Sequence, residues 1–180
     1  ERIFTKFEED VGLGIGSGVC SINSKFGQKI EHTTKEHTRG GLKTYRKTCF
    51  DEIGGVREVD GWDGLDNTLA QMNGWRTGSF SDIVALHLRE TGGHYGQIRS
   101  QYEAGSFAHF MGYYWAYLLA RSFFQFFKWP YFFGGLSMML GYFSGLINRR
   151  ERFSESEVIR YIRKRQKRRI FGIFGIMGDK

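Results

Sequence analysis

The residues that could carry chemistry gather between residues 39 and 92 of this 180-residue chain. Within this stretch, Asp60, Asp63 and Asp66 recur at every third position, in an acidic loop that runs into an expected helix over 65–73. A carboxylate beside a hydroxyl can accept its proton as a general base. A carboxylate in the first turn of a helix can instead be stabilised by the helix dipole. The aspartates therefore admit a catalytic and a structural interpretation.

Three further side chains in the stretch are candidates for binding. The guanidinium of Arg39 has the forked shape that suits phosphate, although a surface arginine is an equally good interpretation. His87 ends an expected strand, and a lone histidine is more often structural than a ligand. Trp62 is either an aromatic platform or a buried anchor. Cys20 and Cys49 lack metal-ligand spacing, so we expect free thiols.

These residues have to be positioned by alternating helices and strands. Hydrophobic periodicity predicts helices over 2–10 and 47–53, a strand over 13–22, and a turn followed by a strand over 74–88, with a polar loop over 23–38. Glycines in the first strand have the spacing G-x-G-x-G, which differs from the G-x-G-x-x-G of a phosphate loop, and a closely packed strand is favoured. The fold class is therefore α/β.

Four motifs follow one another through this stretch. They are G-x-x-x-x-Y-R-K-x-C-F-x-x-I-G-G from residue 40, G-W-D-x-x-D from 61, G-W-x-T-x-S-F-x-D from 74 and H-x-R-x-T-G from 87. In order and spacing they resemble the second half of inverting family 2 glycosyltransferases. The resemblance runs from about Phe4 to the end and implies a partial GT-A fold, which is Rossmann-like. It implies transfer of a sugar, with inversion, from a nucleotide-activated donor to a glycan or lipid-linked acceptor, as in polysaccharide biosynthesis.

The resemblance also implies a catalytic base. In the family this is the aspartate of an E-D motif, and counting back from Gly74 places Asp63 at that position, with Trp62 where the family has glutamate. Asp66, one turn further on, is the alternative base or a substrate-binding residue.

The remaining site residues also come from the resemblance. Arg39, Gly41, Trp62 and Arg89 would line the donor and acceptor cleft, and His87 would bind a metal or contact the diphosphate. The implied cofactor is a divalent metal, Mg²⁺ or Mn²⁺. The acceptor motif Q-x-x-R-W of processive members is absent, so processive polymerisation is disfavoured.

The family's metal-binding D-x-D occurs nowhere in the sequence. We therefore expect the 180 residues to be the C-terminal portion of a longer enzyme, inactive by itself. The alternative hypothesis, in which the chain is not an enzyme, is a non-catalytic membrane-anchoring or scaffold subunit.

The C-terminal half predicts contact with a membrane. We expect the catalytic portion to occupy 1–100, aromatic and apolar membrane-associated helices 101–150, and a basic amphipathic tail 151–180. Residues 129–147 contain no charge and are long enough to cross a bilayer, although an interfacial hairpin or a buried core helix also fits. The net charge of +7 and the basic tail favour anionic phospholipid at the cytoplasmic face over nucleic acid.

Overall fold

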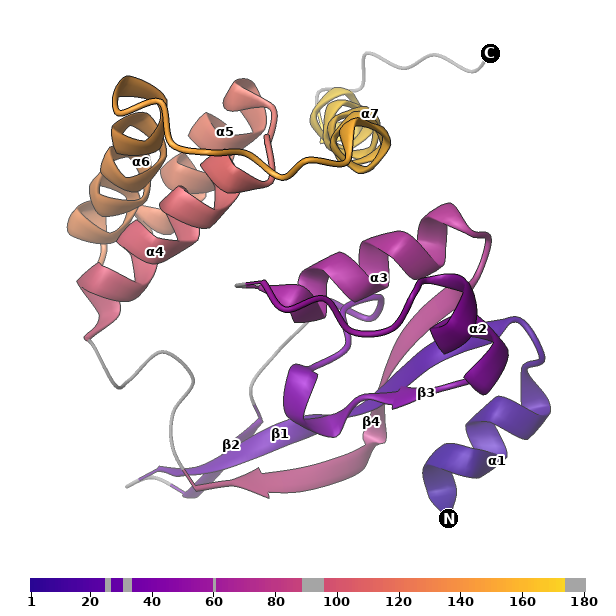
Figure 1. Cartoon of the computed structure of the whole chain (residues 1–180). Coiled ribbons are helices and arrows are strands. Elements are labelled where there is room, and N and C mark those ends of the chain that lie inside the picture. Colours follow the sequence, from indigo (N-terminus) through magenta and orange to yellow (C-terminus); the bar gives the residue numbers. More distant parts are fainter. Residues whose placement is uncertain (25–26, 31–33, 60, 89–95, 174–180) are drawn as a thin grey trace. The chain divides into compact units, whose positions relative to one another are not determined.

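The computed structural model describes residues 1–24, 27–30, 34–59, 61–88 and 96–173. It divides the chain into two compact units, Glu1–Glu90 and Thr91–Lys180 (Figure 1). The first unit combines helices with a mixed sheet and the second contains helices, so the predicted α/β class is confirmed for the first unit. The predicted boundary at residue 100 falls inside a helix of the second unit.

The first unit is built around one long strand. Its elements are α1 (Arg2–Glu9), β1 (Leu13–Ser24), β2 (Gly27–Ile30), a 3-10 turn η1 (Gly40–Leu42), β3 (Thr44–Tyr45), α2 (Lys47–Glu52), α3 (Trp62–Met72) and β4 (Arg76–His87). Strand β4 runs parallel to β1 along one edge, from the pair Leu13–Arg76 to the pair Ile22–His87. The short strands β2 and β3 pair antiparallel with β1 along its other edge.

The glycines of β1 admit other elements close to the strand. A Cβ at Gly16 would lie 3.1 Å from Phe7 and 3.2 Å from Ile3, so this position accommodates α1. Neighbouring Ser17 instead accepts a hydrogen bond from the backbone N–H of Arg39, at 3.2 Å. Figure 1 shows α1 and α3 on opposite sides of β1. The G-x-G-x-G segment is thus a packed strand, as its spacing predicted.

The predicted helices and strands of the first unit are largely confirmed, with two corrections. Helix α3 begins at Trp62, three residues before the expected start at Leu65, because Gly61 adopts the left-handed backbone conformation (φ 73°) that turns the chain into the helix. The predicted loop over 23–38 is wrong in part, since it contains the end of β1 and all of β2.

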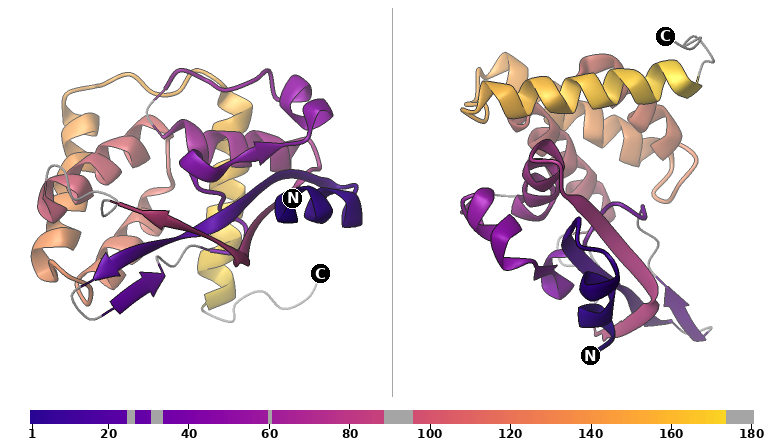
Figure 2. Two further views of the ribbon diagram at one scale, coloured as in Figure 1. Left: turned by 90° about the horizontal axis from the view of Figure 1, so that it is seen from below. Right: turned by 90° about the vertical axis from the view of Figure 1, so that its right-hand side faces the viewer.

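The second unit consists of α4 (Gln97–Phe110), α5 (Trp115–Gln125), α6 (Phe132–Ile147) and α7 (Ser156–Ile173). Helices α4 and α6 touch through glycines: a Cβ at Gly105 would lie 1.9 Å from the Met138 carbonyl oxygen, and one at Gly141 would lie 2.0 Å from that of Tyr102. Gly141 and Gly145 of α6 form a G-x-x-x-G pattern, which favours close helix packing, and a Cβ at Gly145 would lie 2.6 Å from the His109 ring of α4. Figure 2 shows α7 as a straight helix, and hydrogen bonds from Arg163 to the Gly112 carbonyl and from the Tyr114 N–H to Gln166 attach it to the turn between α4 and α5.

The predicted apolar segment 129–147 forms a shorter helix than its composition suggested. Helix α6 has 16 residues, or about 24 Å at 1.5 Å per residue, whereas the hydrocarbon layer is about 30 Å thick. Within the described ranges, no helix is both long enough and apolar enough to span a membrane.

Candidate active site

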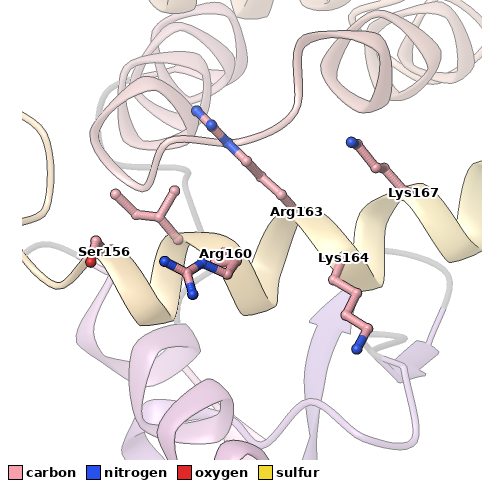
Figure 3. Close-up of a pocket in the computed structure, with 6 residues that line it drawn as sticks. Ser156, Arg160, Arg163, Lys164 and Lys167 are labelled. Atoms are coloured by element: carbon pink, nitrogen blue, oxygen red, sulfur yellow. The ribbon is translucent and has the colours of Figure 1, made fainter.

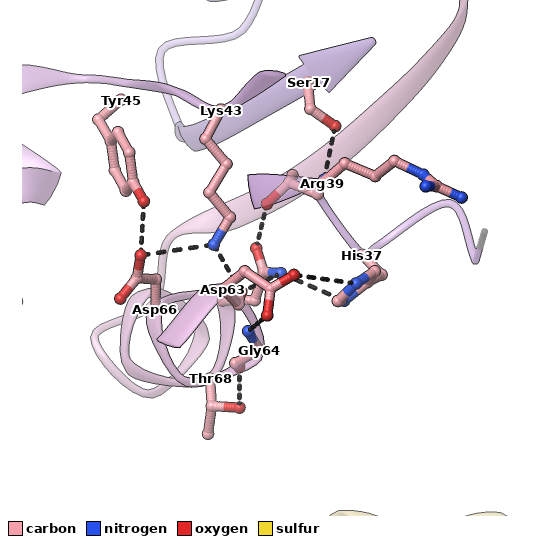
Figure 4. Close-up of polar contacts among 11 residues, drawn as sticks. Ser17, His37, Arg39, Lys43, Tyr45, Asp63, Gly64, Asp66 and Thr68 are labelled. Atoms are coloured by element: carbon pink, nitrogen blue, oxygen red, sulfur yellow. Dashed lines mark hydrogen bonds and ion pairs between the residues drawn. The ribbon is translucent and has the colours of Figure 1, made fainter. Parts of the chain in front are cut away.

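The candidate site lies where the N-terminal end of α3 meets η1 and β3. Because α3 begins at Trp62, Asp63 lies in its first turn and Asp66 follows about one turn later. Residues spaced i, i+3 are neighbours on one face of a helix. The Oδ1 atom of Asp63 accepts a hydrogen bond from the N–H of Gly64 at 2.9 Å. The two aspartates nevertheless occupy very different environments (Figure 4).

Asp66 is completely buried. Its Oδ2 atom accepts a hydrogen bond of 2.5 Å from the hydroxyl of Tyr45 and lies 3.4 Å from the ammonium of Lys43, as Figure 4 shows. The exposed fractions of the Lys43 and Asp66 side chains are 1% and 0%. Within the described residues, the Oδ1 atom of Asp66 has no hydrogen-bond partner. Asp66 is thus enclosed, with Oδ2 engaged by Lys43 and Tyr45, and its role in binding substrate stays a prediction.

The buried cluster shifts the protonation of its members. Burial lowers the pKa of Lys43 below 10.5, although the nearby carboxylates of Asp66 and Asp63 act in the opposite direction. Burial, followed by the hydrogen bond to Asp66, raises the pKa of Tyr45 well above its usual value. Tyr45 therefore keeps its proton and remains the donor in its bond to Asp66.

Asp63 is the more accessible of the two carboxylates. Its side chain is 36% exposed, and Oδ2 lies 3.9 Å from Nε2 of His37, which is 41% exposed. The backbone of Asp63 is held more firmly than its side chain, because its carbonyl oxygen accepts hydrogen bonds from Lys43 Nζ at 2.5 Å and from Asn67 Nδ2 at 3.0 Å. This arrangement fixes a helix end while leaving a carboxylate oxygen open to a reactant.

Trp62 forms one wall beside Asp63. The ammonium of Lys43 lies 5.2 Å from the centroid of the Trp62 ring, and a Cβ at Gly40 would approach that ring to 3.1 Å. The side chain is half-buried, so it is anchored on one side and retains exposed surface. A Cβ at Gly41 would meet no atom within 4 Å among the described residues, which leaves open space beside η1.

Residues 37–39 belong to the polar segment that precedes η1, and hydrogen bonds hold this segment next to the site. The hydroxyl of Thr38 is buried and donates to Oδ1 of Asn67 at 2.7 Å. The neighbouring Arg39 is fixed through its backbone to Ser17, while its side chain extends away from Asp66 on the side of His37 (Figure 4). The structure thus brings Arg39, predicted as a substrate contact, into the same region as Asp63.

Two predicted residues are not brought into this cluster by the described structure. His87 pairs with Ile22, five residues along β1 from Ser17, which corresponds to about 16 Å along a strand. Arg89 lies outside the described residues. In the part of the chain that the structure describes, no three His, Cys, Asp or Glu side chains converge on a position that could hold a metal ion. The divalent metal therefore stays a prediction of the resemblance.

Lys43, Tyr45 and His37 were not predicted as site residues from the sequence. A usable signal was present for the first two, because Lys43, which is extended directly before β3, and Tyr45 within β3 are two residues apart and so point to the same face. For His37 the sequence held no signal. Its proximity to Asp63 depends on the hydrogen bond between Thr38 and Asn67, two residues that lie 29 positions apart in the chain.

Comparison with models of protein families, with curated proteins and with solved structures found no match to this chain. The resemblance of its motifs to family 2 glycosyltransferases therefore remains a prediction from the sequence.

Proposed function

We propose that this chain forms the acceptor side of an inverting GT-A glycosyltransferase, which transfers a sugar from a nucleotide-activated donor to a hydroxyl of a glycan or lipid-linked acceptor. The observation that carries the proposal is the contrast between two carboxylates one turn apart. Asp66 is enclosed by Lys43 and Tyr45, whereas Asp63 stands partly exposed at the end of α3. Such a separation of environments is typical of sites that assign different roles to similar groups.

In the proposed reaction, Asp63 is the base. As the acceptor oxygen attacks the anomeric carbon, its proton passes to a carboxylate oxygen of Asp63, and the bond from that carbon to the nucleoside diphosphate breaks on the opposite face. Oδ1 is held by the Gly64 N–H, which leaves Oδ2, on the His37 side, to receive the proton. The exposed part of Trp62 would pack against a sugar ring.

The other residues act by positioning. Lys43 joins β3 to the first turn of α3 by binding both the Asp63 carbonyl and the Asp66 carboxylate. Arg39, whose side chain extends on the side of His37, would contact a phosphate or acceptor group. A Mg²⁺ or Mn²⁺ ion would neutralise the leaving diphosphate, and the roles given to Asp63 and Lys43 do not depend on that metal.

The experiment is an assay for acceptor-dependent release of nucleoside diphosphate. The protein, purified at its native length as established by intact mass, is incubated with a panel of nucleotide sugars and with lipid extract or oligosaccharide acceptors. The proposal predicts release that requires an acceptor and a product with the inverted anomeric configuration by NMR. Absence of transfer with every donor, from protein that is folded by circular dichroism, would favour the scaffold alternative. A product that retains the donor's configuration would contradict the proposed mechanism.

A further inference from the structure

Seven aromatic side chains cluster where α5 ends, at the turn that follows, and where α6 begins. Each is more than half exposed, and we call this set the aromatic tip: Phe123, Phe124, Phe127, Trp129, Tyr131, Phe132 and Phe133. Ring contacts connect neighbours within it, for example Phe123 with Phe127 at 5.4 Å and Trp129 with Tyr131 at 5.7 Å. Exposed apolar surface of this extent is unusual on a protein face that meets only water.

The exposed apolar surface continues along α6. Leu136, Leu140, Phe143 and Ile147 follow at helical spacing and are 38%, 57%, 37% and 78% exposed. They extend the tip by about 16 Å, at 1.5 Å per residue. The opposite face of α6 carries the glycines and Met138 that pack against α4 and α5. A helix that is apolar on all sides is usually surrounded by apolar groups. Within the described residues, only one side of α6 packs against other helices, so the apolar stripe on its other side is left exposed.

The charges around this surface all have the same sign. From residue 104 to residue 150 there is no aspartate or glutamate, and the charged residues are Arg121, Lys128, Arg149 and Arg150. Lys128 precedes α6, and Arg149 and Arg150 follow it, so cations stand at both ends of the apolar stripe. Residues 91–180 contain 14 Lys and Arg against 5 Asp and Glu, a formal charge of +9, whereas residues 1–90 contain 12 against 14, a charge of −2.

Helix α7 adds further cations next to the tip. It is attached through Gln166, whose side-chain oxygen accepts a hydrogen bond from the Tyr114 N–H at 2.8 Å. A hollow of about 470 Å³ has Arg121 and Phe124 of α5 and Arg169 of α7 in its lining, so α7 ends beside the aromatic tip.

Further along α7, a second hollow of about 480 Å³ is lined by basic side chains (Figure 3). Arg163 and Lys167 in this lining are engaged within the unit, with Arg163 donating to the Gly112 carbonyl at 2.7 Å and Lys167 lying 5.2 Å from the Tyr114 ring. Figure 3 shows Arg160 and Lys164 directed away from these two, and both are exposed. Arg160 and Lys164 are therefore available to an anionic surface.

We propose that the aromatic tip and the exposed stripe of α6 dock in the interfacial layer of one leaflet of an anionic phospholipid bilayer, with the surrounding cations contacting lipid phosphates. Trp and Tyr favour the boundary between headgroups and acyl chains, and amphipathic elements of this kind lie about 5–10 Å deep. A second copy of this chain fits the surface less well, because its rim of cations would face an identical rim. The inference concerns the second unit and does not depend on the proposed transfer reaction.

The first test measures binding of the full chain to vesicles by flotation. The vesicles are phosphatidylcholine with and without phosphatidylglycerol. The tip variant Phe127→Ser/Trp129→Ser replaces two side chains that are 69% and 71% exposed, so folding should be preserved. The matched control, Val84→Ser/Leu88→Ser, replaces two apolar residues of the first unit that are 51% and 87% exposed. We expect the tip variant to lose binding by about tenfold to a hundredfold, from the apolar surface removed, and the control to bind as wild type.

The second test addresses the charges. Lys128→Gln/Arg150→Gln should weaken binding to the anionic vesicles by about fivefold for each cation removed, with a smaller effect at high salt. Three results would overturn the inference. They are equal binding by the tip variant and wild type, wild-type binding that does not change when phosphatidylglycerol is omitted, and a wild-type dimer in vesicle-free buffer that becomes monomeric in the tip variant. The last result would assign the surface to a second copy.

Discussion

Replacing Lys43 with methionine tests whether the buried cluster holds the candidate site together. The substitution removes the ammonium that lies 3.4 Å from the Asp66 carboxylate and 2.5 Å from the Asp63 carbonyl, while a side chain of similar length remains. Asp66 is fully buried, so its charge would stay in the interior, and among the described residues the Tyr45 hydroxyl would remain as a hydrogen-bond donor to it. The free energy of unfolding of the first unit should fall.

The magnitude follows from the two opposing contributions of the cluster. Removing one partner of a buried ion pair costs about 3–5 kcal/mol, because the other charge is left uncompensated. The value here should lie at the low end, about 3 kcal/mol, since the Tyr45 hydroxyl still satisfies Oδ2 of Asp66 and the lowered pKa of Lys43 shows that burying the ammonium is itself unfavourable.

The assay is urea unfolding followed by tryptophan fluorescence. Trp115→Phe and Trp129→Phe, both at exposed positions, limit the signal to Trp62 and Trp75 of the first unit. The matched control is Lys47→Met, because Lys47 pairs with Asp51 at 2.9 Å but is 88% exposed. That surface pair should contribute only about 0.3–0.5 kcal/mol.

A Lys43→Met protein as stable as the Lys47→Met control would refute this reasoning. A second check uses the triple variant Lys43→Met/Tyr45→Phe/Asp66→Leu, which removes all three polar groups together. Because well-packed apolar residues can replace a buried ion pair at little cost, most of the stability lost in Lys43→Met should return.

Three further predictions concern other parts of the molecule. Burial, with smaller contributions from nearby arginines, lowers the pKa of His109 below 6.5, so the unfolded state binds a proton more readily than the folded state. The free energy of unfolding should therefore fall as the pH drops below 6.5, and this fall should be smaller in His109→Gln. Gly105→Ala would place a methyl carbon 1.9 Å from a backbone oxygen of α6 and should lower the melting temperature of the second unit strongly, whereas Gly172→Ala, with open space around it, should raise it slightly. Cys20 and Cys49 are buried, and burial raises the pKa of Cys49 to about 11, so native protein at pH 8 should react with a thiol reagent far more slowly than unfolded protein.

The elements of the first unit that carry strong periodicity were predictable from the sequence. Strand β1 and the final strand β4 follow from alternating and apolar runs, and α1 from apolar residues at helical spacing. The start of α3 was missed because a left-handed glycine, Gly61, decided it, and such a conformation leaves no hydrophobic pattern. The start of α4 at Gln97 lies before the helical region expected from residue 101, and the buried residues Gly105, Ala108 and His109 give little apolar signal for where this helix begins.

The candidate site was predictable in part. The position of Asp63 came from motif spacing, but the distinction between an exposed Asp63 and a buried Asp66 depends on Lys43 and Tyr45, which lie more than 20 residues earlier in the chain. Pairing across that distance is set by the sheet and the helix together, and spacing along the sequence does not encode it. The length of α6 also escaped prediction, because an uninterrupted apolar run does not show where a helix begins.

The central claim is that Asp63 is the base of a glycosyl transfer, and the most direct measurement is kcat for Asp63→Asn in the protein at its native length. Loss of a general base should lower kcat by about 10²–10⁴-fold, with little change in the urea midpoint because the Asp63 carbonyl bonds remain. Asp82→Asn, at a side chain that is 55% exposed, is the matched control and should retain wild-type kcat. Wild-type turnover by Asp63→Asn would contradict the account and remove this carboxylate from the mechanism.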